Sequence, residues 1–335
     1  MAQTVCLIPG DGIGPEVAQS TRDIIEASGV DIDWIELPAG AGVVDEYGDI
    51  MPQSTLDTIR GNRIALKGPI TTPIGKGFKS ANVRLRKALD LYAAVRPVRS
   101  MPGIKTRYED VDLVIIRENT EGLYSGIENE ITDGVVASMK VATRKASERI
   151  ARFAFNYART RQRDKVTVFH KANIMKMSDG LFIDCASRMH EEIFPELPYE
   201  ELIIDNGCMQ MVTDPNQFDT LLLENLYGDV LSDLCAGLVG GLGVVPGANI
   251  GDECAVFEAV HGSAPDIAGQ DKANPLALIM SGVMMLNHLG ETESAKKIKV
   301  AYDSVLEARN PEEITVDIGG QGGTKAFTEA VIRQL

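Results

Sequence analysis

Residues 5–16 read VCLIPGDGIGPE, an apolar run that leads through a glycine-rich loop to a proline. Residues 5–9 have the length and composition of a buried strand, and Pro15 suits the first turn of a helix. The glycines are spaced G-x-G-x-G, whereas dinucleotide-binding loops have G-x-G-x-x-G. We therefore expect a tight structural turn here, with a nucleotide cradle as the alternative.

Strand-like and helix-like segments alternate along the rest of the chain. Further strands are expected over 63–67, 111–116, 165–169, 202–204 and 220–223. Helices are expected from about residue 15 and near 80–90, 143–160, 178–192, 228–239, 274–288 and 294–308. This alternation is typical of an α/β fold with a largely parallel sheet. A chain of 335 residues favours two domains, although no linker marks the boundary.

Composition and charge narrow the functional classes. The chain is 44% apolar and 24% charged, which indicates a globular protein. No apolar stretch approaches the ~18 residues of a membrane span. The net charge of −15 argues against general nucleic-acid binding, and an anionic substrate would need a local cluster of Arg and Lys. The first residues resemble neither a secretory nor an organellar leader, so we expect a cytoplasmic location. The five scattered cysteines are expected to be buried thiols.

Five residues are candidates for a site that binds an anionic substrate, and three of them are arginines. Ser80 is a candidate N-cap of the helix near 80–90, and it could gather with Asn82 and Arg86 at one helix end. Arg96 and Arg117 end or follow strand-like runs, and strand ends are where α/β sheets usually bind ligands. Arginine forks bind carboxylates in bidentate fashion. Each arginine could instead form a surface ion pair.

Asp229 and Asp233 stand four residues apart in an apolar helical segment. They share one helix face, where like charges repel unless something compensates. A divalent cation bound through carboxylate oxygens fits this spacing. The alternative is that Asp229 is an N-cap and Asp233 is merely exposed.

The segment HKAN at 170–173 directly follows a predicted strand. Lys171 could act as a base if burial or nearby positive charge lowers its pKa. A surface lysine is the alternative interpretation.

The segment HGSAPDIAG at 261–269 is a small-residue loop that contains one acid, Asp266. A carboxylate can accept hydrogen bonds from both hydroxyls of an adenosine ribose and repels a 2′-phosphate. The alternative is an ordinary loop that leads into the helix near residue 274.

Taken together, these motifs resemble the β-decarboxylating dehydrogenase family, which includes isocitrate, homoisocitrate and 3-isopropylmalate dehydrogenases. The match spans nearly the whole chain, and within the family the chain is most similar to the NAD-dependent isocitrate branch. The blocks that carry the resemblance are IPGDGIGPE at 8–16, RENTEGLY at 117–124, HKAN at 170–173, NLYGD at 225–229, HGSAPD at 261–266 and DIGG at 317–320.

The resemblance implies a two-domain α/β fold that is not a Rossmann fold, with the active site in the interdomain cleft. Residues 1–95 and 245–335 would form the large, cofactor-binding domain. Residues 96–244 would form the small domain, with the dimer interface and the metal and substrate residues. The family also implies a homodimer whose two chains share active sites.

The resemblance also assigns roles by position. The substrate carboxylates would be held by Ser80, Asn82, Arg86, Arg96 and Arg117. Mg²⁺ or Mn²⁺ would be bound by Asp229, Asp233 and Asp205 of the partner subunit. Protons would be handled by Tyr124 and Lys171 of the partner subunit. NAD would be bound by Thr72, His261, Gly262, Asp266, Ile267 and Asn274.

Isocitrate is the expected substrate because Ser80 and Asn82 offer hydrogen-bond donors for its carboxymethyl arm. Isopropylmalate enzymes resemble one another in having leucines there, and homoisocitrate enzymes typically have an arginine in this segment. Homoisocitrate dehydrogenase is the main alternative, and isopropylmalate dehydrogenase a weaker one. A non-catalytic regulatory subunit is the alternative from another class, although the positions of Tyr124, Lys171 and the three aspartates are all filled.

Overall fold

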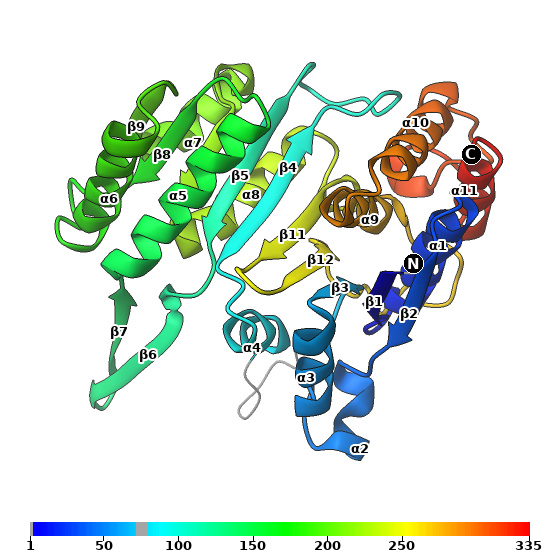
Figure 1. Cartoon of the computed structure of the whole chain (residues 1–335), viewed down its shortest axis with the longest axis horizontal. Helices are drawn as coiled ribbons and strands as arrows, with labels where there is room; N and C mark the ends of the chain where they lie inside the picture. Colours follow the sequence, from blue (N-terminus) through cyan, green and yellow to red (C-terminus); the bar gives the residue numbers. More distant parts are fainter. Residues whose placement is uncertain (1–2, 72–79) are drawn as a thin grey trace.

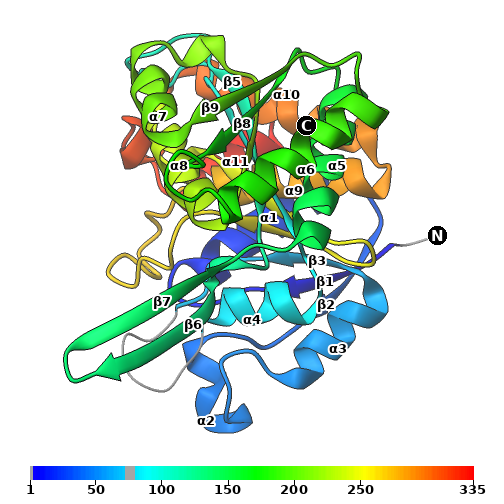
Figure 2. The ribbon, with the colours of Figure 1, turned by 90° about the vertical axis from the view of Figure 1, so that its left-hand side faces the viewer.

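The computed structural model describes residues 3–71 and 80–335. Within them, ten strands form one sheet in the order β2-β1-β3-β12-β11-β4-β5-β10-β8-β9, with helices on both faces (Figure 1). These strands are β1 Gln3–Ile8, β2 Ile32–Glu36, β3 Ile64–Lys67, β4 Ala93–Arg99, β5 Asp112–Glu118, β8 Val166–His170, β9 Tyr199–Ile203, β10 Thr220–Leu223, β11 Pro246–Ile250 and β12 Ala255–Ala259. The strands β6 Gly122–Thr132 and β7 Val135–Val141 form a separate hairpin that projects from the body (Figure 2).

Within the described residues, seven α-helices match helices that the sequence predicts, and four, at Val44–Tyr47, Gln53–Asn62, Ile204–Thr213 and Thr324–Ile332, were not predicted. The α-helices are α1 Gly14–Ala27, α2 Val44–Tyr47, α3 Gln53–Asn62, α4 Ala81–Ala88, α5 Arg144–Thr160, α6 Ser178–Ile193, α7 Ile204–Thr213, α8 Asn225–Leu238, α9 Leu276–Leu289, α10 Thr292–Ala308 and α11 Thr324–Ile332. None of the helices in the described ranges combines the length and apolar content that a membrane span requires.

The sheet is parallel except around β4 and β11, which pair antiparallel with both of their neighbours. The predicted α/β class with a largely parallel sheet is therefore confirmed. Three strands of the sheet were not predicted, namely β2, β11 and β12, and β4 was indicated only by the strand-like run at Arg96. Strand β9 begins at Tyr199 rather than at residue 202. The projecting hairpin was not predicted either.

The spacing of apolar residues in helix α5 explains how this helix packs against the sheet. Ile150, Ala154 and Ala158 recur every four residues and are fully buried, as is Phe155, whereas Arg152 is exposed. Thr143 caps the helix by accepting a hydrogen bond from the backbone N–H of residue 146, at 3.2 Å. Burial of a side chain such as Ile150 or Phe155 contributes roughly 1.5–3 kcal/mol, so this stripe holds α5 against the sheet.

The predicted domain boundaries both fall near the middle of the sheet. Position 95/96 lies inside β4, and position 244/245 lies just before β11. Consequently β1, β2, β3, β11 and β12 come from residues 1–95 and 245–335, whereas β5, β8, β9 and β10 come from residues 96–244. That these halves behave as separate domains stays a prediction.

The first loop is the predicted tight turn. Gly10 and Gly12 have φ angles of +80° and +60°, which favour glycine. A Cβ atom on Gly12 would lie 2.0 Å from the backbone oxygen of Ser263. The N–H of Ile13 donates to that same oxygen at 2.8 Å, so the turn packs directly against the loop at 261–269.

A candidate active site at the centre of the sheet

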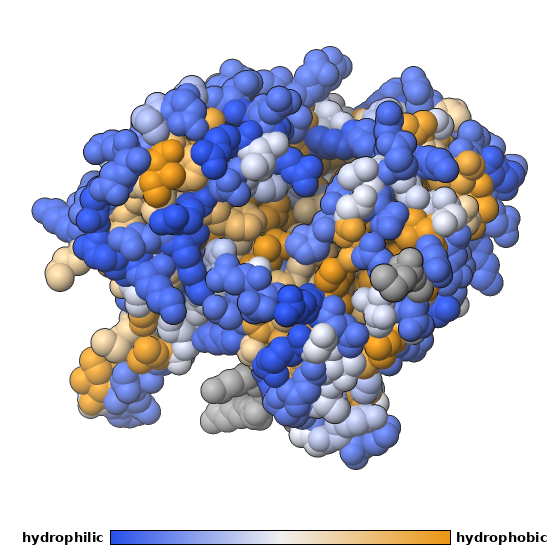
Figure 3. All heavy atoms as spheres, in the orientation of Figure 1, coloured by the Kyte–Doolittle hydropathy of each residue, from blue (hydrophilic) through white to orange (hydrophobic). Residues whose placement is uncertain are grey.

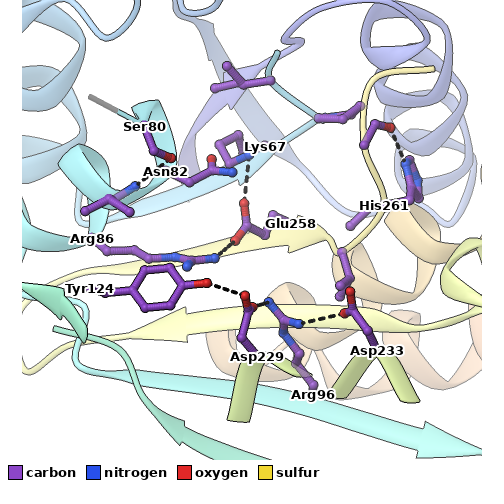
Figure 4. Close-up of a pocket in the computed structure, with 16 residues that line it drawn as sticks. Lys67, Ser80, Asn82, Arg86, Arg96, Tyr124, Asp229, Asp233, Glu258 and His261 are labelled. Carbon is purple, nitrogen blue, oxygen red and sulfur yellow. Dashed lines mark hydrogen bonds and ion pairs between the residues drawn. The ribbon is translucent and has the colours of Figure 1, made fainter. Parts of the chain in front are cut away.

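A polar cavity of about 250 Å³ lies between the start of α4, helix α8 and the strands β3, β4 and β12 (Figure 4). It gathers nine of the predicted site residues, which come from five separate parts of the chain: Ser80, Asn82, Arg86, Arg96, Tyr124, Asp229, Asp233, His261 and Gly262. Lys67 of β3 and Glu258 of β12 also line it, and sequence reasoning missed both. Both halves of the sheet therefore contribute side chains to one cavity.

The start of α4 supplies the polar wall. Ser80 is the N-cap that the sequence predicts, and its Oγ accepts a hydrogen bond from the N–H of Val83 at 3.5 Å. Asn82 Oδ1 and Arg86 Nε are buried and have no hydrogen-bond partner within residues 3–71 and 80–335. Unsatisfied buried polar atoms are costly, so this wall is suited to a polar ligand.

A buried ionic cluster holds Arg86 in place. Glu258 lies 2.7 Å from Lys67 Nζ and 3.1 Å from a terminal nitrogen of Arg86, and it accepts a hydrogen bond from Asn249 at 2.6 Å. Burial alone would raise the pKa of Glu258, but Lys67 and Arg86 hold it well below its usual range. Glu258 thus stays ionised and fixes the arginine at the cavity wall.

Helix α8 carries the two aspartates. It begins at Asn225, and its N-cap is Glu224, which accepts the N–H of Tyr227 at 3.0 Å. Asp229 therefore lies inside the helix, and the interpretation of Asp229 as an N-cap is wrong. The carboxylate of Asp229 accepts hydrogen bonds from Arg117 and from the hydroxyl of Tyr124. Burial would raise the pKa of Asp229, but Arg117 and Tyr124 lower it, so this group is ionised at neutral pH.

Asp233 lies one helical turn farther and is more exposed than Asp229. Burial raises the pKa of Asp233 and the charge of Asp229 raises it further, whereas Arg96, at 3.5 Å, lowers it. This is the like-charge repulsion that the spacing predicts. Within the described ranges, no three His, Cys, Asp or Glu side chains come together as a metal site. One chain thus offers two carboxylates, and a hard divalent cation would need further oxygen donors.

Arg117 and Tyr124 both donate hydrogen bonds to Asp229, but of the two only Tyr124 lines the cavity. Arg117 is fully buried behind Asp229 and does not line the cavity, although the family resemblance implies that it binds a substrate carboxylate there. Its guanidinium donates to Asn225 Oδ1 at 2.6 and 3.1 Å. Burial, together with the hydrogen bond to Asp229, raises the pKa of Tyr124, so its hydroxyl remains a proton donor.

Lys171 and Asp205 lie outside the cavity lining and pair with each other. Lys171 follows β8, and its backbone N–H donates to Asp179 at 2.7 Å. Asp205 is exposed in the first turn of α7. Within one chain these two groups are therefore not combined with Asp229 and Asp233.

The residues expected to bind a cofactor are only partly gathered. His261 Nε2 is buried and has no partner in the described part of the chain, and burial lowers the pKa of this imidazole, so it is neutral. Asp266 is exposed and Ile267 is partly exposed in the following loop. Asn274 donates to Asp317 at 3.0 Å and is outside the cavity lining. Thr72 lies outside the described residues.

Comparison with known proteins gives consistent results. A family model described as isocitrate/isopropylmalate dehydrogenase matches residues 4–331. Isocitrate dehydrogenase (NAD) catalytic subunit 5, mitochondrial, of Arabidopsis thaliana is 51% identical over 99% of this chain and 88% of that protein. A mitochondrial protein of Dictyostelium discoideum, named as a regulatory subunit of isocitrate dehydrogenase (NAD), is 50% identical over 99% and 92%. The chloroplastic 3-isopropylmalate dehydrogenase of Solanum tuberosum is 53% identical over 90% and 84%.

A solved structure extends the similarity to three dimensions. The crystal structure of isocitrate dehydrogenase from Methylococcus capsulatus superposes with a TM-score of 0.95 at 49% identity. The superposition covers 100% of this chain and 99% of that one.

Proposed function

The chain belongs to the isocitrate/isopropylmalate dehydrogenase family, and from this premise we propose that it oxidises and decarboxylates isocitrate with NAD in an Mg²⁺- or Mn²⁺-dependent reaction. The observation that carries the proposal is the cavity itself. Its polar and cationic wall, with Ser80, Asn82 and Arg86, faces two carboxylates on α8, and Arg96 of β4 lies beside these carboxylates (Figure 4). This arrangement fits a small polyanion that bridges arginines and a divalent cation.

The residues present fit the two groups that the reaction requires. Asp229 and Asp233 supply hard oxygen donors for Mg²⁺ or Mn²⁺. The buried Nε2 of His261, which has no partner among the described residues, is suited to a polar group of NAD. When bound, the cation would polarise the C2 hydroxyl and carboxylate of isocitrate, and NAD would accept the hydride.

The chain's own side chains would carry out the remaining steps. Arg86 and Arg96 would hold the substrate carboxylates, and Arg117 would support this from behind by orienting Asp229. Lys171 of the partner subunit would take the hydroxyl proton as hydride leaves C2. After CO₂ departs, Tyr124 would return a proton to the substrate carbon, since its hydroxyl is protonated and directed at Asp229. The products would be 2-oxoglutarate, CO₂ and NADH.

Ser80 and Asn82 support isocitrate over its relatives. Their side chains offer short hydrogen-bond donors at the wall where the carboxymethyl arm would lie. Homoisocitrate remains the main alternative, with 3-isopropylmalate behind it. Cytoplasmic location also stays a prediction, because the Arabidopsis relative is named as mitochondrial.

We propose that the chain forms a homodimer with shared active sites. Large apolar side chains stay exposed on the β6–β7 hairpin (Figure 3), on α7 and on α8. Monomers rarely leave such a surface uncovered. They are Ile127, Ile131, Val135, Val136 and Met139 of the hairpin, Met209 and Val212 of α7, and Val230 of α8. Asp205 lies on α7 beside this surface, which supports a role for the Lys171–Asp205 pair in the partner's site.

The shared-site proposal predicts a specific complementation. Lys171→Met and Asp233→Asn should each be almost inactive alone at the metal and isocitrate concentrations that saturate the unaltered chain. After the two variants exchange chains, each mixed dimer should hold one site with both lesions and one intact site. Random exchange of equal amounts makes about half of the dimers mixed, so about a quarter of wild-type activity should return. If each group served its own chain, every site would carry a lesion and steady-state assays would show no recovery.

The cofactor assignment predicts a preference for NAD of at least about tenfold in kcat/KM, because the Asp266 carboxylate would accept ribose hydroxyls and repel a 2′-phosphate. Asp266→Lys combined with Ile267→Tyr should shift the preference towards NADP. Asp184→Lys on α6, which makes the same change of charge elsewhere, should leave the preference unchanged. Equal use of both cofactors by the unaltered chain would overturn this assignment.

Product analysis tests the proposed function against the regulatory alternative. The purified chain, given isocitrate, NAD and Mg²⁺, should form NADH, CO₂ and 2-oxoglutarate in equal amounts. A chain that is inert alone and only stimulates a separate catalytic chain would be regulatory, as the name of the Dictyostelium relative describes that protein.

A further inference from the structure

A second hollow, of about 570 Å³, lies on the other face of the central strands. Figure 1 looks onto this face, with α5 on one side and α9 on the other, and Figure 3 shows the surface hollowed between them. Side chains alternate along a strand, so one strand serves both faces. Arg96 of β4 lines the candidate active site, whereas Val95 and Pro97 line this hollow. In β12, likewise, Glu258 lines the candidate active site and Phe257 lines this hollow.

The floor of the hollow is apolar. It is formed by Val95, Val114, Ala248, Ile250 and Phe257 from four adjacent strands. Phe153 and Tyr157 of α5 form one wall, and Met284 and His288 of α9 form the opposite wall. The ring of His288 packs edge-on against Phe257, with their centroids 5.6 Å apart. This combination of volume, apolar floor and aromatic walls is typical of small-molecule sites.

The rim carries one cation without a counter-charge. Arg163 is satisfied, because it pairs with Asp112 at 2.8 Å and with Asp219. The guanidinium of Arg161 forms no hydrogen bond or ion pair with the residues that the structure describes, and it lies 5.9 Å from the centroid of the Tyr157 ring. Burial raises the pKa of Tyr157, and partial burial lowers the pKa of His288, so both are neutral at physiological pH. Arg161 is therefore the charged group of the lining that has no ion-pair partner among the described residues.

We propose that this hollow binds a small amphipathic monoanion, with an aromatic or branched aliphatic body on the apolar floor and a single carboxylate at Arg161. Charge complementarity selects one anionic group, and the uncharged floor disfavours di- and tricarboxylates, because their further charges would lose hydration without gaining a partner. The inference goes beyond the proposed function and does not depend on isocitrate being the substrate.

Ligand-observed NMR titrations with two matched probes test the proposal. The probes are 4-phenylbutyrate and its uncharged analogue 4-phenylbutan-1-ol, each added to the purified full chain. Both should bind saturably, and the acid about threefold more tightly, as expected for one partly exposed ion pair. Arg161→Gln should remove the advantage of the acid. Arg159→Gln, which removes a cation that pairs with Glu196 from the same end of α5, should not.

A second variant tests the location. Met284→Trp should fill the hollow and weaken the binding of both probes, while an excess of isocitrate and NAD should not displace them. Arg161 lies at an exposed helix end, so its variant is expected to fold normally even if Met284→Trp does not. Absence of saturable binding, an acid advantage that survives Arg161→Gln, or competition by isocitrate would each overturn the proposal.

Discussion

Replacement of Ser80 by Asp is expected to lower kcat/KM for isocitrate by roughly a thousandfold. A carboxylate at this position would stand against the distal carboxylate of isocitrate, and two such charges about 4 Å apart repel by roughly 4 kcal/mol near a protein surface. Aspartate is as good an N-cap as serine, so α4 should keep its start and the fold its stability. Steady-state kinetics with isocitrate and saturating NAD would measure the loss.

Ser80→Ala is the control that separates charge from capping. It removes the acceptor for the N–H of Val83 and costs about 1 kcal/mol of stability, but it adds no charge. Its loss of kcat/KM should therefore be much smaller, and its melting temperature should fall instead. If Ser80→Asp left the isocitrate kinetics unchanged, the carboxymethyl arm would lie elsewhere and the substrate assignment would fail.

Removal of divalent cations is expected to abolish turnover, and Mg²⁺ or Mn²⁺ should restore it. Asp229 and Asp233 repel each other across one helical turn, and the rise in the pKa of Asp233 reflects its burial first and this repulsion second. A cation would relieve it and would link the protein to the substrate. Asp233→Asn keeps the shape of the side chain but removes a charged ligand, so the apparent affinities for metal and isocitrate should weaken together.

Asp57→Asn on the surface of α3 provides the matched control, since the exposed carboxylate of Asp57 is bonded to Arg60 and Gln53 of the same helix. It should change neither affinity. Titration of Mg²⁺ at several isocitrate concentrations would measure both quantities. Full activity in metal-free buffer, or an Asp233→Asn enzyme with unchanged Mg²⁺ dependence, would contradict the metal assignment.

The local sequence predicted the structure correctly where a single segment determines it. The spacing of the glycines at 10–14 predicted a tight turn, and the N-cap character of Ser80 predicted the start of α4. The strand at 220–223 was predicted at its observed bounds because its four residues are buried on both faces and read as one apolar run. By contrast, β4 carries two arginines and a proline, so its burial depends on partners that no local pattern reveals.

The site was harder to predict because its chemistry depends on distant pairings. Lys67 reads as an ordinary strand-end lysine, yet it is buried against Glu258, 191 positions later in the sequence. The sequence signal that could have revealed this pair is a charged residue, Lys67 or Glu258, at the end of an otherwise apolar run. The position of Arg117 in the sequence was enough to assign it to the site, but it did not reveal which way the side chain points. In the structure, Asp229 lies between the guanidinium of Arg117 and the cavity.

The most direct measurement for the central claim is a comparison of kcat/KM for the purified chain with isocitrate, homoisocitrate and 3-isopropylmalate, each with NAD and with NADP. We expect isocitrate with NAD to give the highest value, since Ser80 and Asn82 suit the short carboxymethyl arm and Asp266 disfavours NADP. A higher value with homoisocitrate or 3-isopropylmalate, or no turnover of isocitrate by the chain alone, would contradict it.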